Sequence, residues 1–233
     1  MADAPHWIVV ALIAAASATV TPAYAQNAPP APSGSAPASI AEAASATTRF
    51  ADLGQTLLSP NALQSDRDEI ARRLIGRRTP ESIAALSAAL KDTANRGAAQ
   101  LAAARAIAID LNPDPTFIQP LFNLIGSDPI LTDAAISALA AYRQNADVQT
   151  RLIALAMNAQ HQQKPATQLS AIKAVGAMTD KRAAQALVTL VSSDAERTAI
   201  RNAAGDALAQ MTGLAGGQDA AQWQKWWTDN SDR

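Results

Sequence analysis

Few residues of this chain have the types or the spacing that chemistry requires. His161, in the segment NAQHQQKP, is the only histidine after residue 25, and the chain has no cysteine. Protein zinc sites are built mainly from cysteine and histidine, and a catalytic triad needs a nucleophile beside its histidine. No acid stands next to His161 in the sequence, and no nucleophile motif such as G-x-S-x-G occurs. We therefore interpret His161 as a loop residue and predict no catalytic residue, no bound metal and no cofactor.

Two turn-like segments carry acidic residues, NPDP at 112–115 and SDP at 127–129. Neither has the D-x-[DN]-x-[DN]-G spacing of an EF-hand calcium loop. Aspartate before proline is common in turns and at helix N-termini, so these residues are predicted to cap helices. The glycine-rich segment LAGGQ, at 214–218, also lacks a phosphate-binding spacing and is predicted to end one helix and turn into the next.

The segment DAAQWQKWW, at 219–227, holds three of the four tryptophans of the chain: Trp223, Trp226 and Trp227. Spacings of three and four place these indoles on one face of a helix. Such a face can be a platform on which a ligand stacks, or it can cover the end of a hydrophobic core. The second interpretation depends on what precedes the cluster.

The rest of the chain has the composition of packed helices. Hydrophobic residues make up 48% of it and aromatic residues only 4%, with alanine the main apolar type. From Ile40 onward the apolar spacing is helical, and strand patterns are absent. Most breaks between segments pair a polar residue with proline, which suits the first turn of a helix. The breaks fall at 59–60, 79–80, 112–115, 128–129, 164–165, 179–180 and 213–217.

Two independent ladders repeat along these helices. The first has an alanine followed four residues later by a larger aliphatic residue, and its alanines are Ala71, Ala103, Ala135, Ala171 and Ala204. The second has aliphatic pairs four residues apart, at 53/57, 86/90, 121/125, 153/157 and 187/191. Both have intervals of 32–36 residues. Because two ladders share one period, we predict a helical hairpin repeated about five times.

The segments TDAAISALAAY and IRNAAGDALAQM resemble the second helix of HEAT repeats, particularly the short bacterial HEAT-like form. The resemblance covers about residues 40–230. It implies an all-α, armadillo-like fold, a right-handed α-solenoid superhelix of about five antiparallel helix hairpins. It also implies a curved scaffold whose second helices line the concave face and bind a large partner. The tryptophan-rich segment 218–230 is then predicted to be a C-terminal capping helix, since the last repeat of a solenoid must be covered.

Basic residues recur at one position of this repeat. Two residues past each ladder alanine stand Arg73, Arg105, Ser137, Lys173 and Asp206. Equivalent positions of a solenoid line up along one surface. With Arg77 and Arg143 expected about one turn beyond this row, we predict a basic strip for an acidic protein segment or an anionic envelope polymer.

The N-terminal part has the features of an export signal. Residues 8–20, IVVALIAAASATV, are apolar, and TPAYAQ then offers cleavage between Ala25 and Gln26. The apolar run is too short to span a bilayer, and no lysine or arginine precedes it. An uncleaved anchor or a buried N-terminal helix is the alternative. Residues 26–39, rich in proline, alanine and serine, are predicted to be a disordered linker that tethers the repeat domain, residues 40–230.

Together these patterns predict an exported protein, periplasmic or extracellular, that acts as a non-enzymatic protein-interaction scaffold. Its net charge of −1 shows no nucleic-acid footprint, and we expect a monomer with no membrane span once the signal is removed. Two other functions stay open. One is an accessory or lyase-like protein acting on a bound ligand, and the other is an envelope carbohydrate-binding module that uses the tryptophan cluster.

Overall fold

The computed structural model describes residues 52–95, 97–158, 164–214, 217 and 219–231. The chain divides into two units, Met1–Ser39 and Ile40–Arg233, and all described residues belong to the second. They form helices and connecting loops, with no strand in the part of the chain that is described. This confirms the predicted all-α class. The predicted leader, its cleavage position between Ala25 and Gln26, the linker and His161 lie outside the described residues.

The helices are short and closely spaced along the chain. Residues 52–58 are helical. The elements that follow are α2 (Gln64–Arg77), α3 (Pro80–Lys91), α4 (Ala98–Ala108), the 3₁₀ helix η1 (Pro115–Phe117), α5 (Ile118–Leu124), α6 (Pro129–Leu139), α7 (Ala146–Met157), α8 (Pro165–Gly176), α9 (Lys181–Val191), α10 (Thr198–Thr212) and α11 (Ala220–Asn230).

Helix starts follow the polar–proline pairs of the sequence. Helices α3, α6 and α8 and the 3₁₀ helix η1 all begin at a proline. The Asp128 carboxylate accepts hydrogen bonds from the backbone N–H groups of Ile130, at 2.8 Å, and Leu131, at 3.2 Å. The Asp114 carboxylate accepts one from the N–H of Thr116 at 2.9 Å. Both acids therefore cap helices, as predicted, because these bonds satisfy backbone donors that the first turn leaves unpaired.

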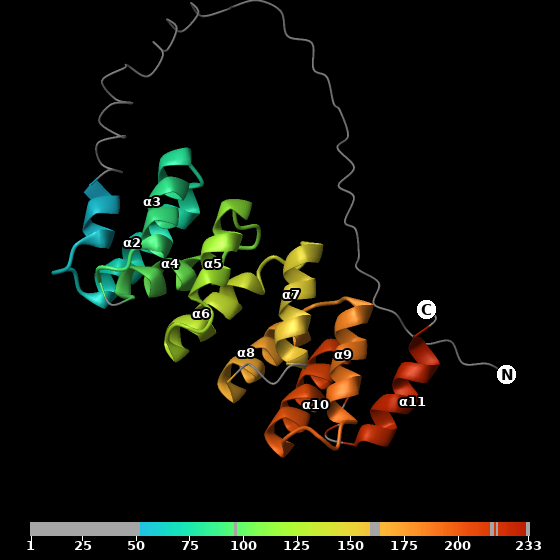
Figure 1. Ribbon diagram of the computed structural model, residues 1–233. Coiled ribbons are helices and arrows are strands. Elements are labelled where there is room, and N and C mark those ends of the chain that lie inside the picture. The colour runs from blue at the N-terminus through green and yellow to red at the C-terminus, as the bar shows by residue number, and fades with distance from the viewer. Residues whose placement is uncertain (1–51, 96, 159–163, 215–216, 218, 232–233) are drawn as a thin grey trace, which may run out of the picture. The chain divides into compact units, whose positions relative to one another are not determined.

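The helices lie in two rows (Figure 1). Helices α2, α4, α6, α8 and α10 are the second helices of the hairpins and form what we call the second row, in which each packs against the next. The first row holds α3, α5, α7, α9 and α11, and α3, α5, α7 and α9 each pack against the second-row helix that follows them in the chain. Stacked antiparallel hairpins of this kind make a solenoid-like fold. Helix α11 packs against α9, so it extends the first row past the last hairpin and covers its end.

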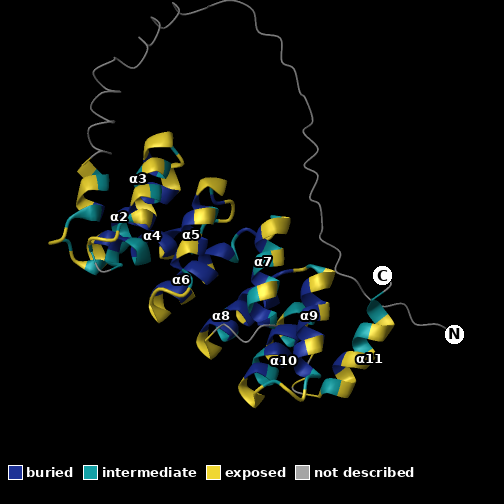
Figure 2. Ribbon diagram, in the orientation of Figure 1, coloured by how far each residue is buried: buried dark blue, intermediate teal, exposed yellow. Residues whose placement is uncertain are grey.

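Alanine explains how closely the second row packs. All five ladder alanines have no exposed surface, and Figure 2 shows dark-blue buried stretches along these helices. Gly176, at the end of α8, lies closer still to α10. A Cβ added at Gly176 would stand 2.7 Å from the Cβ of Ala207 and 3.0 Å from its Cα. Residues with small side chains therefore set the distance between neighbouring repeats.

One predicted register differs from the structure. The aliphatic ladder places Ile153 and Met157 on the inner face of the fourth first-row helix, α7. Both are only partly buried, whereas Leu152 and Ala156 have no exposed surface. The inner stripe of α7 is thus shifted by one residue, because an alanine fills a core position that the ladder assigned to a larger residue.

Candidate functional site

The residues of the predicted strip occupy one position of the second row. Arg73, Arg105, Ser137, Lys173 and Asp206 each lie on a different helix, α2, α4, α6, α8 and α10 in that order. All five are exposed. Residues on either side of them are mostly buried, since each helix packs against its neighbours in the row and against a first-row helix. We call this line of five residues and the surface around it the second-helix face.

Acidic residues reduce the charge of this face at its N-terminal end. The Nε atom of Arg73 donates to Oε1 of Glu69 at 2.9 Å, which is an ion pair between residues four apart on one helix. The hydrogen bond and charge of Arg73 lower the pKa of the Glu69 carboxyl. Arg105 makes an ion pair with Asp68 of α2 at 3.2 Å. Lys173, by contrast, has no ion-pair partner among the described residues.

Arg77 and Arg143 lie in different places. Arg77 is exposed in the last turn of α2, one turn beyond Arg73, as expected. Arg143 is exposed in the turn between α6 and α7, off the row of second helices. The structure therefore joins Arg77 to the second-helix face and assigns Arg143 to a neighbouring edge of the domain.

That edge carries a groove that the sequence patterns did not predict. It has a volume of about 1090 Å³ and lies where the second-row helices α2, α4 and α6 end and the next first-row helices begin. Its lining comes from successive hairpins and includes Arg78, Asp110, Leu111, Tyr142 and Arg143. Ser137 lines it too, so the groove borders the second-helix face. We call it the loop-edge groove.

Hydrogen bonds connect several residues that line the groove. The Tyr142 hydroxyl donates to the backbone oxygen of Asp114 at 2.7 Å. Burial, with a smaller effect of the charges of Asp114 and Asp110, raises the pKa of this phenol, which therefore stays protonated and remains a donor. The Asp110 carboxylate accepts from the Arg78 guanidinium and, at 3.1 Å, from the N–H of Asn112. The loop between α4 and η1 is thus fixed at both ends.

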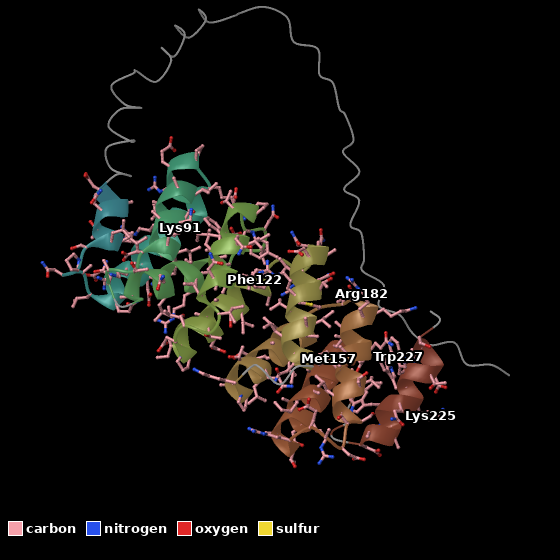
Figure 3. The ribbon with its side chains drawn as sticks, in the orientation of Figure 1. Lys91, Phe122, Met157, Arg182, Lys225 and Trp227 are labelled. Atoms are coloured by element: carbon pink, nitrogen blue, oxygen red, sulfur yellow. The ribbon has the colours of Figure 1, made fainter. Side chains whose placement is uncertain are left out.

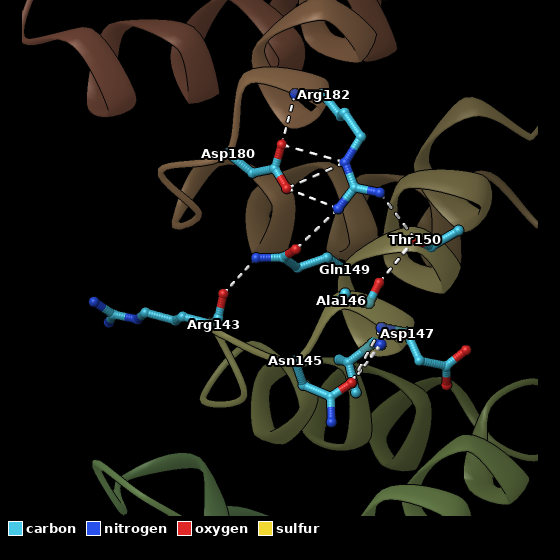
Figure 4. A network of polar contacts seen from close by, with 9 residues as sticks. Arg143, Asn145, Ala146, Asp147, Gln149, Thr150, Asp180 and Arg182 are labelled. Atoms are coloured by element: carbon cyan, nitrogen blue, oxygen red, sulfur yellow. Dashed lines mark hydrogen bonds and ion pairs between the residues drawn. The ribbon is translucent and has the colours of Figure 1, made fainter.

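Two arginines, Arg182 and Arg151, link neighbouring helices of the first row. Figure 4 shows Arg182 of α9 donating to the Gln149 side chain of α7 at 3.1 Å while it is held by Asp180, the N-cap of its own helix. The hydrogen bond from Arg182 lowers the pKa of the Asp180 carboxyl. Arg151 of α7 lies over the Phe122 ring of α5, 3.3 Å from its centre. These contacts link neighbouring first-row helices and engage both arginines.

The tryptophan cluster is packed against the core. Trp223 is 1% exposed, and its indole N–H donates to the backbone oxygen of Gly217 at 2.9 Å. Trp226 and Trp227 are half-buried, and Trp227 lies between α11 and α9 (Figure 3). The rings of Trp223 and Trp226 meet edge to face, with centres 6.1 Å apart. Because Trp223 is almost fully buried, the three rings do not form a flat exposed platform for a sugar.

The described residues contain no group of three or more histidine, cysteine or acidic side chains that could hold a metal ion. Within the same residues, no helix is long and apolar enough to cross a membrane.

No protein-family model matches the sequence, and no curated protein matches it. The class that the structure defines is a stack of helical hairpins closed by a tryptophan-rich helix. The resemblance to HEAT repeats stays a prediction.

Sequence reasoning missed the loop-edge groove and the first-row arginine contacts. Leu111 carried a signal for the groove, since it is a large aliphatic residue that stands in the polar turn DLNPDP, outside both ladders. Nothing comparable marks Arg151 or Arg182, because their partners lie about 30 residues earlier in the chain and no local spacing connects them.

Proposed function

We propose that this protein is a non-enzymatic scaffold that binds a partner protein along its second-helix face. The proposal is supported above all by one observation. Five stacked helices present an exposed side chain at the same repeat position, and no other described element packs over them. Such surfaces are the extended binding sites of repeat proteins, since equivalent residues can contact a long partner at regular intervals.

Export and the HEAT-like ancestry belong to the same proposal. The apolar leader and the linker predicted from residues 1–39 support a location outside the cytoplasm, and the repeat pattern supports membership of the HEAT-like class. The uneven charge of the second-helix face indicates where an acidic partner would bind. Arg73 and Arg105 are already ion-paired, so an acidic partner meets its strongest unpaired charge at Lys173.

The second candidate, a carbohydrate-binding module, depended on exposed indoles. Full burial of Trp223 and partial burial of its two neighbours favour a structural role for the cluster. No observation on the described residues favours the accessory or lyase-like alternative over a scaffold.

Charge reversal on the second-helix face tests the proposal. We expect the triple variant Arg73→Glu, Arg105→Glu, Lys173→Glu to reduce partner capture from an envelope extract by about tenfold or more, because rim and interface charges control association. The measurement is quantitative affinity capture with the immobilised variant against the wild type. Thermal unfolding should change little, since all three side chains are exposed.

The matched control changes the net charge equally on the first row. The variant Lys91→Glu, Lys181→Glu, Lys225→Glu places its substitutions in α3, α9 and α11, where the three lysines are also exposed. We expect this control to capture the partner as the wild type does. Equal loss of capture in both triple variants would show a general charge effect and would contradict a specific face.

A further inference from the structure

We infer that the loop-edge groove is a second docking site, which takes an extended segment of another protein carrying a carboxylate side chain beside bulky aliphatic side chains. This inference goes beyond the second-helix face, because it concerns different residues at the ends of the second-row helices. Three observations carry it: the exposed aliphatic residues on the rim, the direction of the charges, and the size of the groove.

Exposed aliphatic side chains gather at the rim. Five large hydrophobic residues are markedly exposed in the described part of the chain, and two of them, Ile109 and Leu111, stand in the groove lining. Their exposed fractions are 65% and 94%. Single exposed aliphatic residues are common on protein surfaces, but two that share the rim of a groove mark a contact site more strongly.

The rim residues are held outward by the backbone. Asp110, which stands between Ile109 and Leu111, has a side chain only 8% exposed and points inward to Arg78. Its carboxylate also accepts from the N–H of Asn112, which forms a local turn. Because Asp110 is anchored inside, the side chain of Leu111 is presented to solvent by a fixed loop. Because the loop is already ordered, its conformational entropy falls little when a partner binds over Leu111.

The charges of the groove favour an acidic partner. Both lining carboxylates are engaged within the chain, Asp110 by Arg78 and Asp114 by the N–H of Thr116. The Arg78 side chain is 52% exposed but is already paired with Asp110, so the outward-facing charge available to a partner is the guanidinium of Arg143. The backbone oxygen of Arg143 accepts a hydrogen bond from the Gln149 side chain, while its guanidinium points away from that network (Figure 4). No ion-pair partner of Arg143 is present among the described residues, so it offers a carboxylate an unoccupied bidentate donor.

The dimensions favour an extended segment. A volume of about 1090 Å³ lies at the upper end of the range of small-molecule pockets, and the lining runs across the ends of successive hairpins, as an extended segment requires. The chain's own linker does not have the required chemistry, because residues 26–39 contain neither an acid nor a leucine, isoleucine or valine. A segment of another protein is therefore the occupant to which the inference commits.

Peptide selection tests this inference directly. A phage library of random dodecapeptides is selected on the full chain, and the recovered sequences are synthesised and titrated by fluorescence anisotropy. We expect the binders to share an acidic residue within a few positions of leucine, isoleucine or valine. Leu111→Ser and Arg143→Glu should each weaken their binding by about tenfold or more, as loss of a central interface contact does.

Matched controls use the same substitutions elsewhere. Leu63→Ser removes a leucine that is 67% exposed outside the groove, and Arg72→Glu reverses an exposed arginine of α2. Both controls should bind the peptides within about twofold of the wild type. Circular dichroism of all four variants verifies that the exposed substitutions leave the fold intact.

Several results would overturn the inference. These are a selection that yields no binders, binders that lack acids, or binders whose affinity is unchanged by Leu111→Ser and Arg143→Glu. Binders that lose affinity only in the Arg73, Arg105, Lys173 triple variant would contradict the groove and support the second-helix face instead. Self-association of the wild type that Leu111→Ser abolishes would identify a second copy of the chain as the occupant.

Discussion

Trp223→Ala is expected to lower the free energy of unfolding by about 3–5 kcal/mol, the usual cost of removing a fully buried large aromatic side chain. Trp223 is the largest side chain with almost no exposed surface in the described residues. Its ring joins α11 to the core beside α9, and its N–H satisfies the backbone oxygen of Gly217. Equilibrium denaturation by urea, followed by circular dichroism, measures the effect.

The neighbouring indole provides the control. Trp227→Ala removes a half-buried ring of the same size and should cost clearly less than Trp223→Ala. Because repeat arrays lose order from their ends, hydrogen exchange in the Trp223→Ala variant should increase first in α9 and α10. Wild-type stability in Trp223→Ala would contradict the capping role and make a ligand-binding role for the cluster worth testing again.

Arg67→Met is expected to destabilise the N-terminal end by about 2–4 kcal/mol, since a buried acceptor left without its donor costs about 1–3 kcal/mol. Arg67 is 5% exposed. Its guanidinium donates to the backbone oxygens of Leu57, at 3.2 Å, and Ala62, at 2.8 Å, and also to that of Ser59. The side chain thereby closes the loop between the helical residues 52–58 and α2. Thermal and urea unfolding measure the loss.

The matched substitution is Arg72→Met in the same helix. Arg72 is 55% exposed and makes only a surface ion pair with Glu69, so its removal should change stability by no more than about 0.5 kcal/mol. Similar unfolding curves for the two variants would show that the Arg67 hydrogen bonds contribute no more than a surface contact.

The repeat architecture was predictable because its signals are local. The ladder alanines sit where two helices cross, and a larger residue would push the helices apart, so the same residue type returns in every hairpin. Helix starts were predictable for the same reason, as shown by Asp128, whose carboxylate bonds to backbone groups within three residues. Asp219 likewise caps α11 through the N–H groups of Ala221 and Gln222.

The inner register was less predictable where alanine itself fills the core. In α7 the buried residues are Val148, Leu152 and Ala156, while the aliphatic ladder selected Ile153 and Met157. Alanine is common on every face of these helices, so its burial at Ala156 leaves no distinctive pattern in the sequence. A ladder of larger residues then aligns one position away from the true inner stripe.

The two candidate sites also differ in how well local spacing in the sequence predicted them. The five positions of the second-helix face were predictable because they share one repeat position. The loop-edge groove was not, because it combines residues of different hairpins, such as Arg78, Leu111 and Arg143, that have no common spacing. Ion pairs also escaped prediction when they joined different helices, as Arg105 and Asp68 do, and these pairs determine how much positive charge the face presents.

Site-specific photo-cross-linking tests the central claim most directly, that a partner protein lies along the second-row side of the array. A photoreactive benzoyl-phenylalanine at Ser137, where the second-helix face meets the loop-edge groove, is compared with one at Gln185, an exposed position of α9 in the first row. We predict one protein cross-linked from position 137 and none from position 185, with the product lost in the Arg73, Arg105, Lys173 triple variant. Cross-linking from position 185 but not from position 137, or from neither position, would contradict the proposed scaffold.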